Sequence, residues 1–202
     1  GSAVATTLER MGHEVLGVDL DGDFVREHKD ELTQVVEADA TEIDTLKQLG
    51  VADFDTAIVA IGTNVEASLL VVLALVDMGL NNVWAKANTD RHGRLLERTG
   101  AHHVVFPERK MGERVAHLVN ERLLDFIAFD AEFAIARLKA PESVIGLPLM
   151  MSECRKRFDV TVVGVKRAGE DFIHAVPDTI IFPDDELVVS GRIRDIEKFA
   201  AI

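Results

Sequence analysis

Small and polar residues follow a series of predicted β-strands in the N-terminal half of the sequence. They are Asp19, Asp39-Ala40-Thr41, Ala60-Ile61-Gly62 and Lys86. An acidic side chain at the position of Asp19 can accept hydrogen bonds from both hydroxyl groups of a ribose, and it repels a 2′-phosphate. A small residue such as Ala40 lets the edge of an adenine approach the backbone. Because open α/β sheets bind ligands at the carboxyl ends of their strands, the set predicts an adenosine ligand of the ATP or NAD type.

Each of these residues also has an ordinary structural explanation. Asp19 can cap the turn before Gly22, and Thr41 can serve as a helix N-cap. Gly62 permits a ligand to approach the backbone closely, but it also suits a simple turn from strand to helix. Lys86 lies near a strand end, where a charge is costly unless it meets a carboxylate or a phosphate. Their position on four successive strand ends favours a binding site.

The apolar pattern between Gly12 and Pro107 predicts alternating strands and helices. The strand candidates are residues 13–19, 34–38, 56–61, 82–87 and 103–106, and the helix candidates are residues 24–29, 42–50, 66–79 and 91–100. Nearly continuous apolar runs are typical of parallel strands that helices cover on both faces. We therefore expect an α/β fold with a doubly wound, Rossmann-like parallel sheet. Since the helical residues 2–11 open the sequence, the first strand of that sheet is expected to be missing from this chain.

The second half of the sequence follows a different pattern. Residues 111–125 predict a long amphipathic crossover helix, with apolar Val115, Leu118, Val119 and Leu123 near 3.6-residue spacing. Strand candidates then follow at residues 133–138, 160–166, 171–175 and 186–190, with helix candidates at 152–158 and 193–201. We expect a nucleotide-binding domain over residues 1–127 and a small α+β C-terminal lobe over residues 128–202.

The composition excludes several classes of protein. The net charge of −13 repels the phosphate backbone, so we expect no nucleic-acid partner. The longest apolar run, residues 69–76, is far shorter than the roughly 20 residues of a membrane span, which predicts a soluble protein. The single cysteine, Cys154, cannot form an internal disulfide, which favours a cytoplasmic location. It has no catalytic partner at a recognisable spacing, so no enzyme is predicted; an NAD-dependent oxidoreductase and a free-standing ligand-binding protein are the alternatives.

Several short motifs together carry a resemblance to a known family. They are residues 1–5, residues 11–15, Val18-Asp19, residues 38–41, residues 59–62, residues 84–87 and residues 107–112. On these motifs the sequence resembles the RCK (regulator of potassium conductance, or KTN) family of TrkA-N and TrkA-C domains. Within that family it is similar to the cytoplasmic regulatory subunits of bacterial Ktr and Trk potassium uptake systems. The resemblance spans essentially all 202 residues.

The resemblance implies a nucleotide-sensing gating-ring subunit that binds ATP, ADP or NAD(H). Its partner would be a potassium-translocating subunit at the inner face of the cell membrane, and it would form homodimers within an octameric ring. Gly1 would be the last glycine of a Gly-x-Gly-x-x-Gly phosphate fingerprint. Glu108 would hold Mg²⁺ or Ca²⁺ at the dimer interface, although a plain carboxylate at a helix N-terminus is the alternative. Residues 143–158 would correspond to a cyclic di-AMP site.

Overall fold

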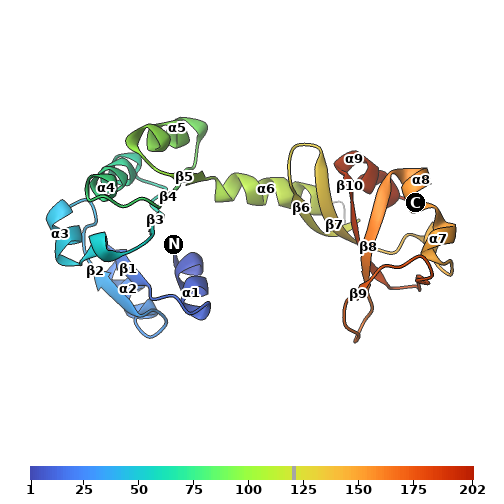
Figure 1. The fold of residues 1–202 in the computed structure, drawn as a ribbon. Coiled ribbons are helices and arrows are strands. Elements are labelled where there is room, and N and C mark those ends of the chain that lie inside the picture. The colour runs from blue at the N-terminus through green and yellow to red at the C-terminus, as the bar shows by residue number, and fades with distance from the viewer. Residues whose placement is uncertain (120–121) are drawn as a thin grey trace. The chain divides into compact units, whose positions relative to one another are not determined.

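The protein consists of two compact units. The computed structural model describes residues 1–119 and 122–202, and Figure 1 shows their helices and strands. The first unit is Gly1–Arg109 and the second unit is Lys110–Ile202. Among the described helices, none has the length and apolar character that a membrane crossing requires.

The strands of the first unit are short and all parallel. β1 (Leu16–Asp19) pairs with β2 (Gln34–Glu37), and β3 (Ala57–Val59), β4 (Val83–Lys86) and β5 (His103–Val105) form a second group in the order β3-β4-β5. All five strands lie within their predicted ranges. The two groups correspond to the two halves of a doubly wound sheet. The predicted Rossmann-like α/β fold is therefore confirmed.

Helices connect these strands and cover them. They are α1 (Ser2–Arg10), α2 (Gly22–His28), α3 (Ile43–Gln48), the short 3-10 helix η1 (Val51–Asp53), α4 (Val65–Asp77) and α5 (Asp90–Thr99). Asn64 and Thr89 cap α4 and α5, because their side-chain oxygens accept backbone N–H groups of the first turn. Gly100 ends α5 in the left-handed conformation, at φ 110°. Val72 and Leu96, which are fully buried, belong to the core that α4 and α5 share with β4.

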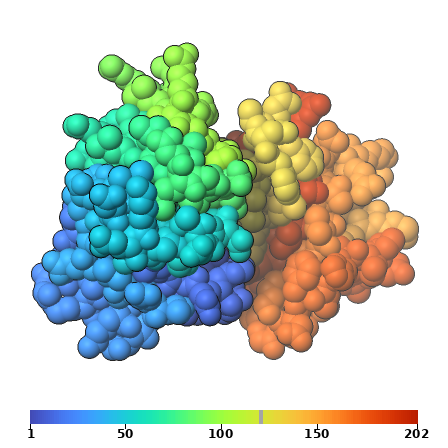
Figure 2. Space-filling model, turned by 60° about the vertical axis from the view of Figure 1, so that its left-hand side comes forward, coloured from blue at the N-terminus to red at the C-terminus, as the bar shows by residue number. Residues whose placement is uncertain are grey.

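The second unit is an antiparallel sheet with small helices. Its strands are β6 (Leu123–Ala128), β7 (Phe133–Lys139), β8 (Val160–Lys166), β9 (Ile173–His174) and β10 (Glu186–Arg192), in the order β6-β7-β10-β8-β9. The helices are η2 (Glu142–Val144), α7 (Leu149–Ser152), α8 (Cys154–Phe158) and α9 (Ile193–Phe199). Leu187 and Phe199 are fully buried in its core. β6 is an edge strand of this sheet, and part of the β6–β7 hairpin, drawn in yellow in Figure 2, is visible at the surface. This unit is the predicted α+β lobe.

The connection between the two halves of the sequence differs from the prediction. Helix α6 (Pro107–Leu118) ends at Leu118, and strand β6 begins at Leu123, so the predicted helix over residues 111–125 is wrong in its last part. Residues 120–121 lie outside the described residues. The compact units divide within α6, earlier than the predicted domain boundary after residue 127, because β6 pairs with β7 and thus belongs to the second sheet.

Candidate functional site

Asp19 is the last residue of β1, and both its side chain and its backbone oxygen accept hydrogen bonds. Its Oδ1 accepts a hydrogen bond from the backbone N–H of Asp21 at 3.0 Å, so it does cap the turn that leads into α2. Its backbone oxygen accepts the N–H of Ala38 at 2.9 Å, which fixes it beside the end of β2. No described residue donates a hydrogen bond to Oδ2. The turn and a ribose hydroxyl can therefore share this carboxylate.

Asp39 and Thr41 form a tight turn after β2. Asp39 Oδ1 accepts hydrogen bonds from the Thr41 hydroxyl at 2.7 Å and from the Thr41 backbone N–H at 2.9 Å. These two bonds hold the pKa of Asp39 below its usual value. Thr41 is thus not the N-cap of α3, since Glu42 occupies that position. Ala40 packs against the hydrophobic core of the first unit.

The ends of β3 and β4 bring a second group of residues together. A Cβ atom added to Gly1 would lie 3.4 Å from Ala60 Cβ, so the start of α1 lies against the end of β3. A Cβ added to Gly62 would lie 3.0 Å from Asn88 Oδ1 and 3.2 Å from Lys86 Cε. Asn88 Nδ2 also donates to the Gly62 carbonyl oxygen at 2.7 Å. Gly62 therefore allows Lys86 and Asn88 to approach closely, while the neighbouring Ile61 packs against the core.

Lys86 at the end of β4 forms an ion pair with Glu108 in the first turn of α6. Its Nζ lies 2.5 Å from Glu108 Oε1. The hydrogen bond from Lys86, followed by one from the backbone N–H of Glu108, lowers the pKa of the Glu108 carboxyl. The Lys86 side chain is 26% exposed and the Glu108 side chain 61% exposed. The strand-end cation thus meets a carboxylate that is itself largely in solvent.

A second ion pair beside this one was not predicted from the sequence. Arg109 donates to Asp90 at 2.6 Å, and its guanidinium lies 4.4 Å from the centre of the Phe106 ring. Asp90 begins α5, so this pair holds the start of α6 against the start of α5. The local sequence carries no signal for this pair, because the two residues are 19 positions apart and only the fold brings them together.

Glu108, the predicted metal ligand, does not belong to a cluster of metal-binding side chains among the described residues. The described residues contain no group of three or more His, Cys, Asp or Glu side chains that could hold a metal ion. Glu108 is one carboxylate and already faces Lys86. The side chains of one chain therefore do not fit a divalent cation by themselves, and the predicted role requires oxygen atoms from a nucleotide or a second copy.

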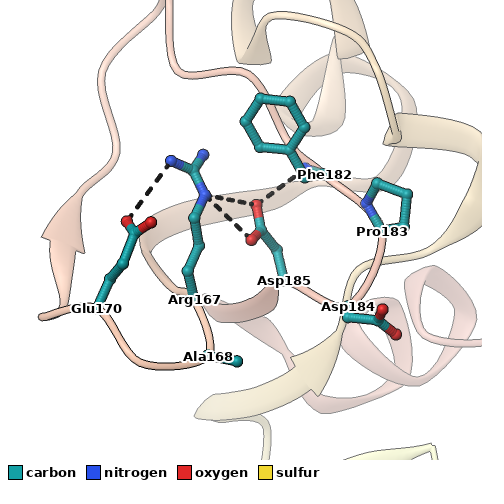
Figure 3. A pocket seen from close by; sticks show the side chains of 7 residues that line it. All are labelled: Arg167, Ala168, Glu170, Phe182, Pro183, Asp184 and Asp185. Atoms are coloured by element: carbon teal, nitrogen blue, oxygen red, sulfur yellow. Dashed lines mark hydrogen bonds and ion pairs between the residues drawn. The ribbon is translucent and has the colours of Figure 1, made fainter.

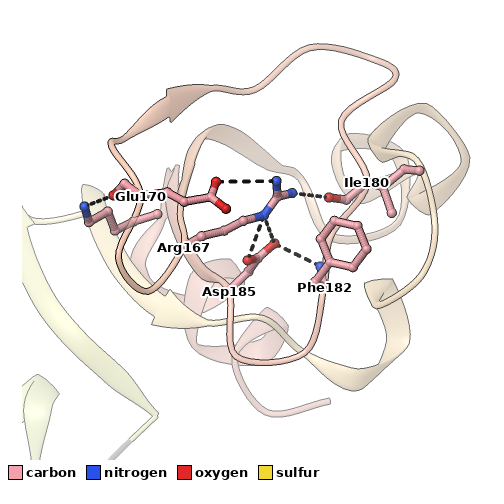
Figure 4. A network of polar contacts seen from close by, with 6 residues as sticks. Arg167, Glu170, Ile180, Phe182 and Asp185 are labelled. Carbon is pink, nitrogen blue, oxygen red and sulfur yellow. Dashed lines mark hydrogen bonds and ion pairs between the residues drawn. The ribbon is translucent and has the colours of Figure 1, made fainter.

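A different polar cluster lies in the second unit, around Arg167 at the end of β8. Arg167 Nε donates to both carboxylate oxygens of Asp185, at 3.2 and 3.4 Å, and its Nη2 donates to the Ile180 carbonyl oxygen at 2.8 Å. Asp185 Oδ2 also accepts the Phe182 N–H at 2.9 Å. Figures 3 and 4 show Arg167 between the carboxylates of Glu170 and Asp185. We call these five residues the Arg167 cluster.

Four residues of the Arg167 cluster, all except Ile180, help to line a cavity of about 300 Å³. The Arg167 guanidinium also lies over the Phe182 ring, at 4.6 Å from the ring centre. Arg167 already donates hydrogen bonds to the Asp185 carboxylate and to the Ile180 carbonyl oxygen. These bonds hold the segment around Ile180 to the ends of β8 and β10. We interpret it as a structural clamp rather than a ligand site.

The predicted cyclic di-AMP region is only partly available at the surface. Val144 is fully buried in the second core, so it cannot line a ligand site. Arg155 donates to the Thr161 hydroxyl at 3.3 Å, and Lys156 pairs with Glu153 at 3.0 Å. Both basic side chains are in exposed residues of α8. The cyclic di-AMP role therefore stays a prediction.

Known protein families match both halves of this chain. The TrkA-N domain family matches residues 1–107, and the TrkA-C domain family matches residues 133–202. This chain belongs to the TrkA-N and TrkA-C family. It is 34% identical to "Ktr system potassium uptake protein C" of Bacillus subtilis (strain 168) over 200 residues, which cover 98% of this chain and 90% of that protein. It is also 34% identical to "Ktr system potassium uptake protein A" of Vibrio alginolyticus over 95% of this chain and 87% of that protein.

Solved structures of TrkA-type domains share the fold. The crystal structure of the GsuK RCK domain superimposes with a TM-score of 0.65 at 20% identity, over 99% of this chain and 44% of that one. The chain thus spans less than half of that GsuK chain. The TrkA-N domain of the inner membrane protein ybaL from Escherichia coli matches 59% of this chain, and 88% of its own length, with a TM-score of 0.52 at 19% identity. The resemblance inferred from the sequence motifs is therefore confirmed.

Proposed function

We propose that this TrkA-type chain is a regulatory subunit of a potassium uptake system and that it senses an adenine nucleotide. Its identity to Ktr system potassium uptake proteins over nearly the whole chain supports the first part. The second part is supported by the polar residues at the carboxyl ends of parallel strands, and a GsuK channel of the same fold is described as bound to NAD. The ligand changes the population of two conformations and is not itself transformed.

One observation carries the nucleotide part of this proposal. The strand ends of the first unit offer a carboxylate with an oxygen to spare at Asp19, and a lysine next to a glycine at Lys86 and Gly62. A carboxylate suits ribose hydroxyls, whereas an ammonium group beside bare backbone suits phosphate. Gly1, Asp39, Ala40, Thr41, Ala60 and Ile61 would complete the site as backbone contacts and small side chains.

Ligand-induced stabilisation tests the nucleotide part. At a ligand concentration 100-fold above its dissociation constant, binding adds about 2.7 kcal/mol to the free energy of unfolding. ADP, ATP and NAD should each raise the melting temperature, and NADP should raise it less because Asp19 repels a 2′-phosphate. Asp19→Ala should remove the difference between NAD and NADP. Asp55→Ala, a change at an exposed aspartate outside the site, serves as the control. Equal stabilisation by NAD and NADP in the wild type would contradict the role of Asp19.

The proposal includes assembly and a membrane partner. Met111 and Val115 on α6, and Val119 just after it, are exposed at four-residue spacing and form one apolar stripe. Such a stripe supports contact with a second copy in a homodimer, and a ring of dimers would act on a potassium-translocating subunit at the cytoplasmic face of the membrane. Light scattering should give a dimer or a larger species, and Val115→Asp should shift the protein towards monomer. A wild-type monomer at micromolar concentration would contradict this assembly.

The predicted cation role of Glu108 belongs to the same proposal. Two copies of Glu108 and two phosphate chains near a twofold axis would repel one another, since each chain already carries a net charge of −13. Mg²⁺ or Ca²⁺ would offset that repulsion. Nucleotide affinity should therefore rise with Mg²⁺ in the wild type and respond less to Mg²⁺ in Glu108→Gln. The same Mg²⁺ response in both proteins would leave Glu108 as a helix-terminal carboxylate.

A further inference from the structure

We propose that Glu108 and a nucleotide phosphate compete for the same ammonium group, that of Lys86. The inference rests on the proposed nucleotide site and adds a regulatory step to it. The ion pair between Lys86 and Glu108 must open before Lys86 can bind phosphate. A bound phosphate would then leave the Glu108 carboxylate free at the start of α6.

The surroundings of Lys86 support competition rather than simultaneous binding. Its Nζ lies 2.5 Å from Glu108 Oε1, and that carboxylate is its only ion-pair partner among the described residues. The Lys86 side chain passes Gly62 so closely that a Cβ there would lie 3.2 Å from Lys86 Cε. On the Gly62 side the neighbouring side chain is the neutral amide of Asn88, so an anion that approaches the ammonium group from there meets no second carboxylate. Two anions at one ammonium group repel each other, so phosphate favours the departure of Glu108.

Glu108 is the partner that can move. Its side chain is 61% exposed, whereas the Lys86 side chain is 26% exposed and comes from a strand with Val83 and Ala85 fully buried. Rotation of the Glu108 side chain into solvent removes one exposed ion pair, which contributes little to stability. The start of α6 remains held by the separate pair between Arg109 and Asp90. Exchange at Lys86 therefore changes the charge at the start of α6 without requiring the helix to unfold.

The competition can be measured as an effect on phosphate affinity alone. Titration calorimetry with EDTA present would give the affinities for ADP and for adenosine in the wild type, Glu108→Gln, Lys86→Met and the double variant. Glu108→Gln should raise ADP affinity about threefold, the scale of an exposed ion pair. Lys86→Met should lower ADP affinity on the order of tenfold through the loss of a charged hydrogen bond. The affinity for adenosine should stay unchanged in all of them.

The double variant separates competition from a general effect of charge. In the Lys86→Met background, Glu108→Gln should give a clearly smaller gain in ADP affinity. Glu113→Gln removes a carboxylate from the same helix, where Glu113 pairs with Lys110 at 3.5 Å, and should leave ADP affinity unchanged. An equal gain in the Lys86→Met background, an equal gain from Glu113→Gln, or no gain from Glu108→Gln would overturn the competition. If the wild type bound neither ADP nor adenosine, the proposed nucleotide function itself would fail.

Discussion

Each unit has an ion pair at the end of a strand. The two cations are about equally exposed, Arg167 at 25% and Lys86 at 26%, but their carboxylate partners lie in different surroundings. In the second unit, Asp185 is 3% exposed, and its carboxylate accepts bonds from Arg167 and from a backbone N–H. In the first unit, Glu108 is 61% exposed, and the pair with Lys86 rests on one contact. A buried carboxylate that loses its partner is costly, whereas an exposed one returns to water.

This difference indicates that the two ion pairs have different functions. We interpret the Arg167 cluster as structural, because the buried Asp185 carboxylate is satisfied by Arg167 and by the Phe182 N–H. The pair between Lys86 and Glu108 contributes little to stability and can exchange with a ligand. The following variants test that contrast, beginning with the largest expected effect.

Breaking the buried pair should cause the largest loss of stability. Asp185→Asn keeps the size of the side chain but removes the buried carboxylate, so Arg167 retains only the 4.0 Å pair with the exposed Glu170. We expect the free energy of unfolding of the second unit to fall by about 3 kcal/mol, as measured by urea denaturation. Lys156→Met, which breaks the exposed pair with Glu153, is the control and should change little. Equal losses in the two variants would contradict the structural role of the Arg167 cluster.

Helix caps should have an intermediate effect in the first unit. Asn64 Oδ1 accepts the N–H of Ala67 at 3.0 Å at the start of α4. Asn64→Ala leaves that N–H without its partner and should lower the free energy of unfolding by about 1 kcal/mol. Asn64→Asp retains an acceptor and should preserve most of the stability. A loss in Asn64→Asp as large as in Asn64→Ala would show that the cap hydrogen bond is not the cause.

A buried histidine should make the first unit sensitive to acid. His92 is 2% exposed, its Nε2 lies 3.3 Å from the Ser68 hydroxyl, and its Nδ1 has no partner among the described residues. Burial lowers its pKa below the usual 6.5, so the folded state favours the neutral ring. Above pH 6.5 the ring is mainly neutral in both the folded and the unfolded state, so the ionisation of His92 does not affect stability. Below pH 6.5 the unfolded chain takes up the proton more readily than the folded one, so the free energy of unfolding falls as the pH falls. Thermal denaturation between pH 8 and pH 5 should show a smaller pH dependence in His92→Gln than in the wild type.

The exposed pair should have the smallest effect on stability. Lys86→Met and Glu108→Gln should each leave the melting temperature of the ligand-free protein nearly unchanged, because the Glu108 carboxylate is largely in solvent and the Lys86 ammonium group is itself partly exposed. Calorimetric scans of both variants beside Asp185→Asn would measure the contrast directly. A loss as large as that of Asp185→Asn would show that the Lys86 pair is structural and would remove the contrast.

The fold could be predicted from the sequence except at the start of β6, where the spacing of apolar residues resembles that of a helix. The strands of the first unit are continuous apolar runs between helix signals, and every one was found. The predicted helix over residues 111–125 extended into strand β6 because Leu123 continues the near 3.6-residue spacing of Val115, Leu118 and Val119. Leu123 instead pairs with Leu138 of β7, with an irregularity in the pairing between Leu123 and Asp125. Such an irregularity depends on the partner strand β7, which the local sequence does not reveal.

The positions of the site residues could be predicted, but not their partners. Strand ends are visible in the sequence, and they located Asp19 and Lys86. The contacts of Lys86 with Glu108, and of Asn88 with the Gly62 carbonyl, join segments that are far apart in the chain. Only the parallel order β3-β4-β5 brings those segments together.

Strand β4 also carries the single tryptophan of a sequence that has no tyrosine. Trp84 stacks on His103 with ring centres 4.1 Å apart, and it shares a face of the strand with Lys86, two residues away. The intrinsic fluorescence of the protein therefore originates almost wholly from one position beside the proposed phosphate contact. Its emission can report ligand binding at this strand end without any attached dye.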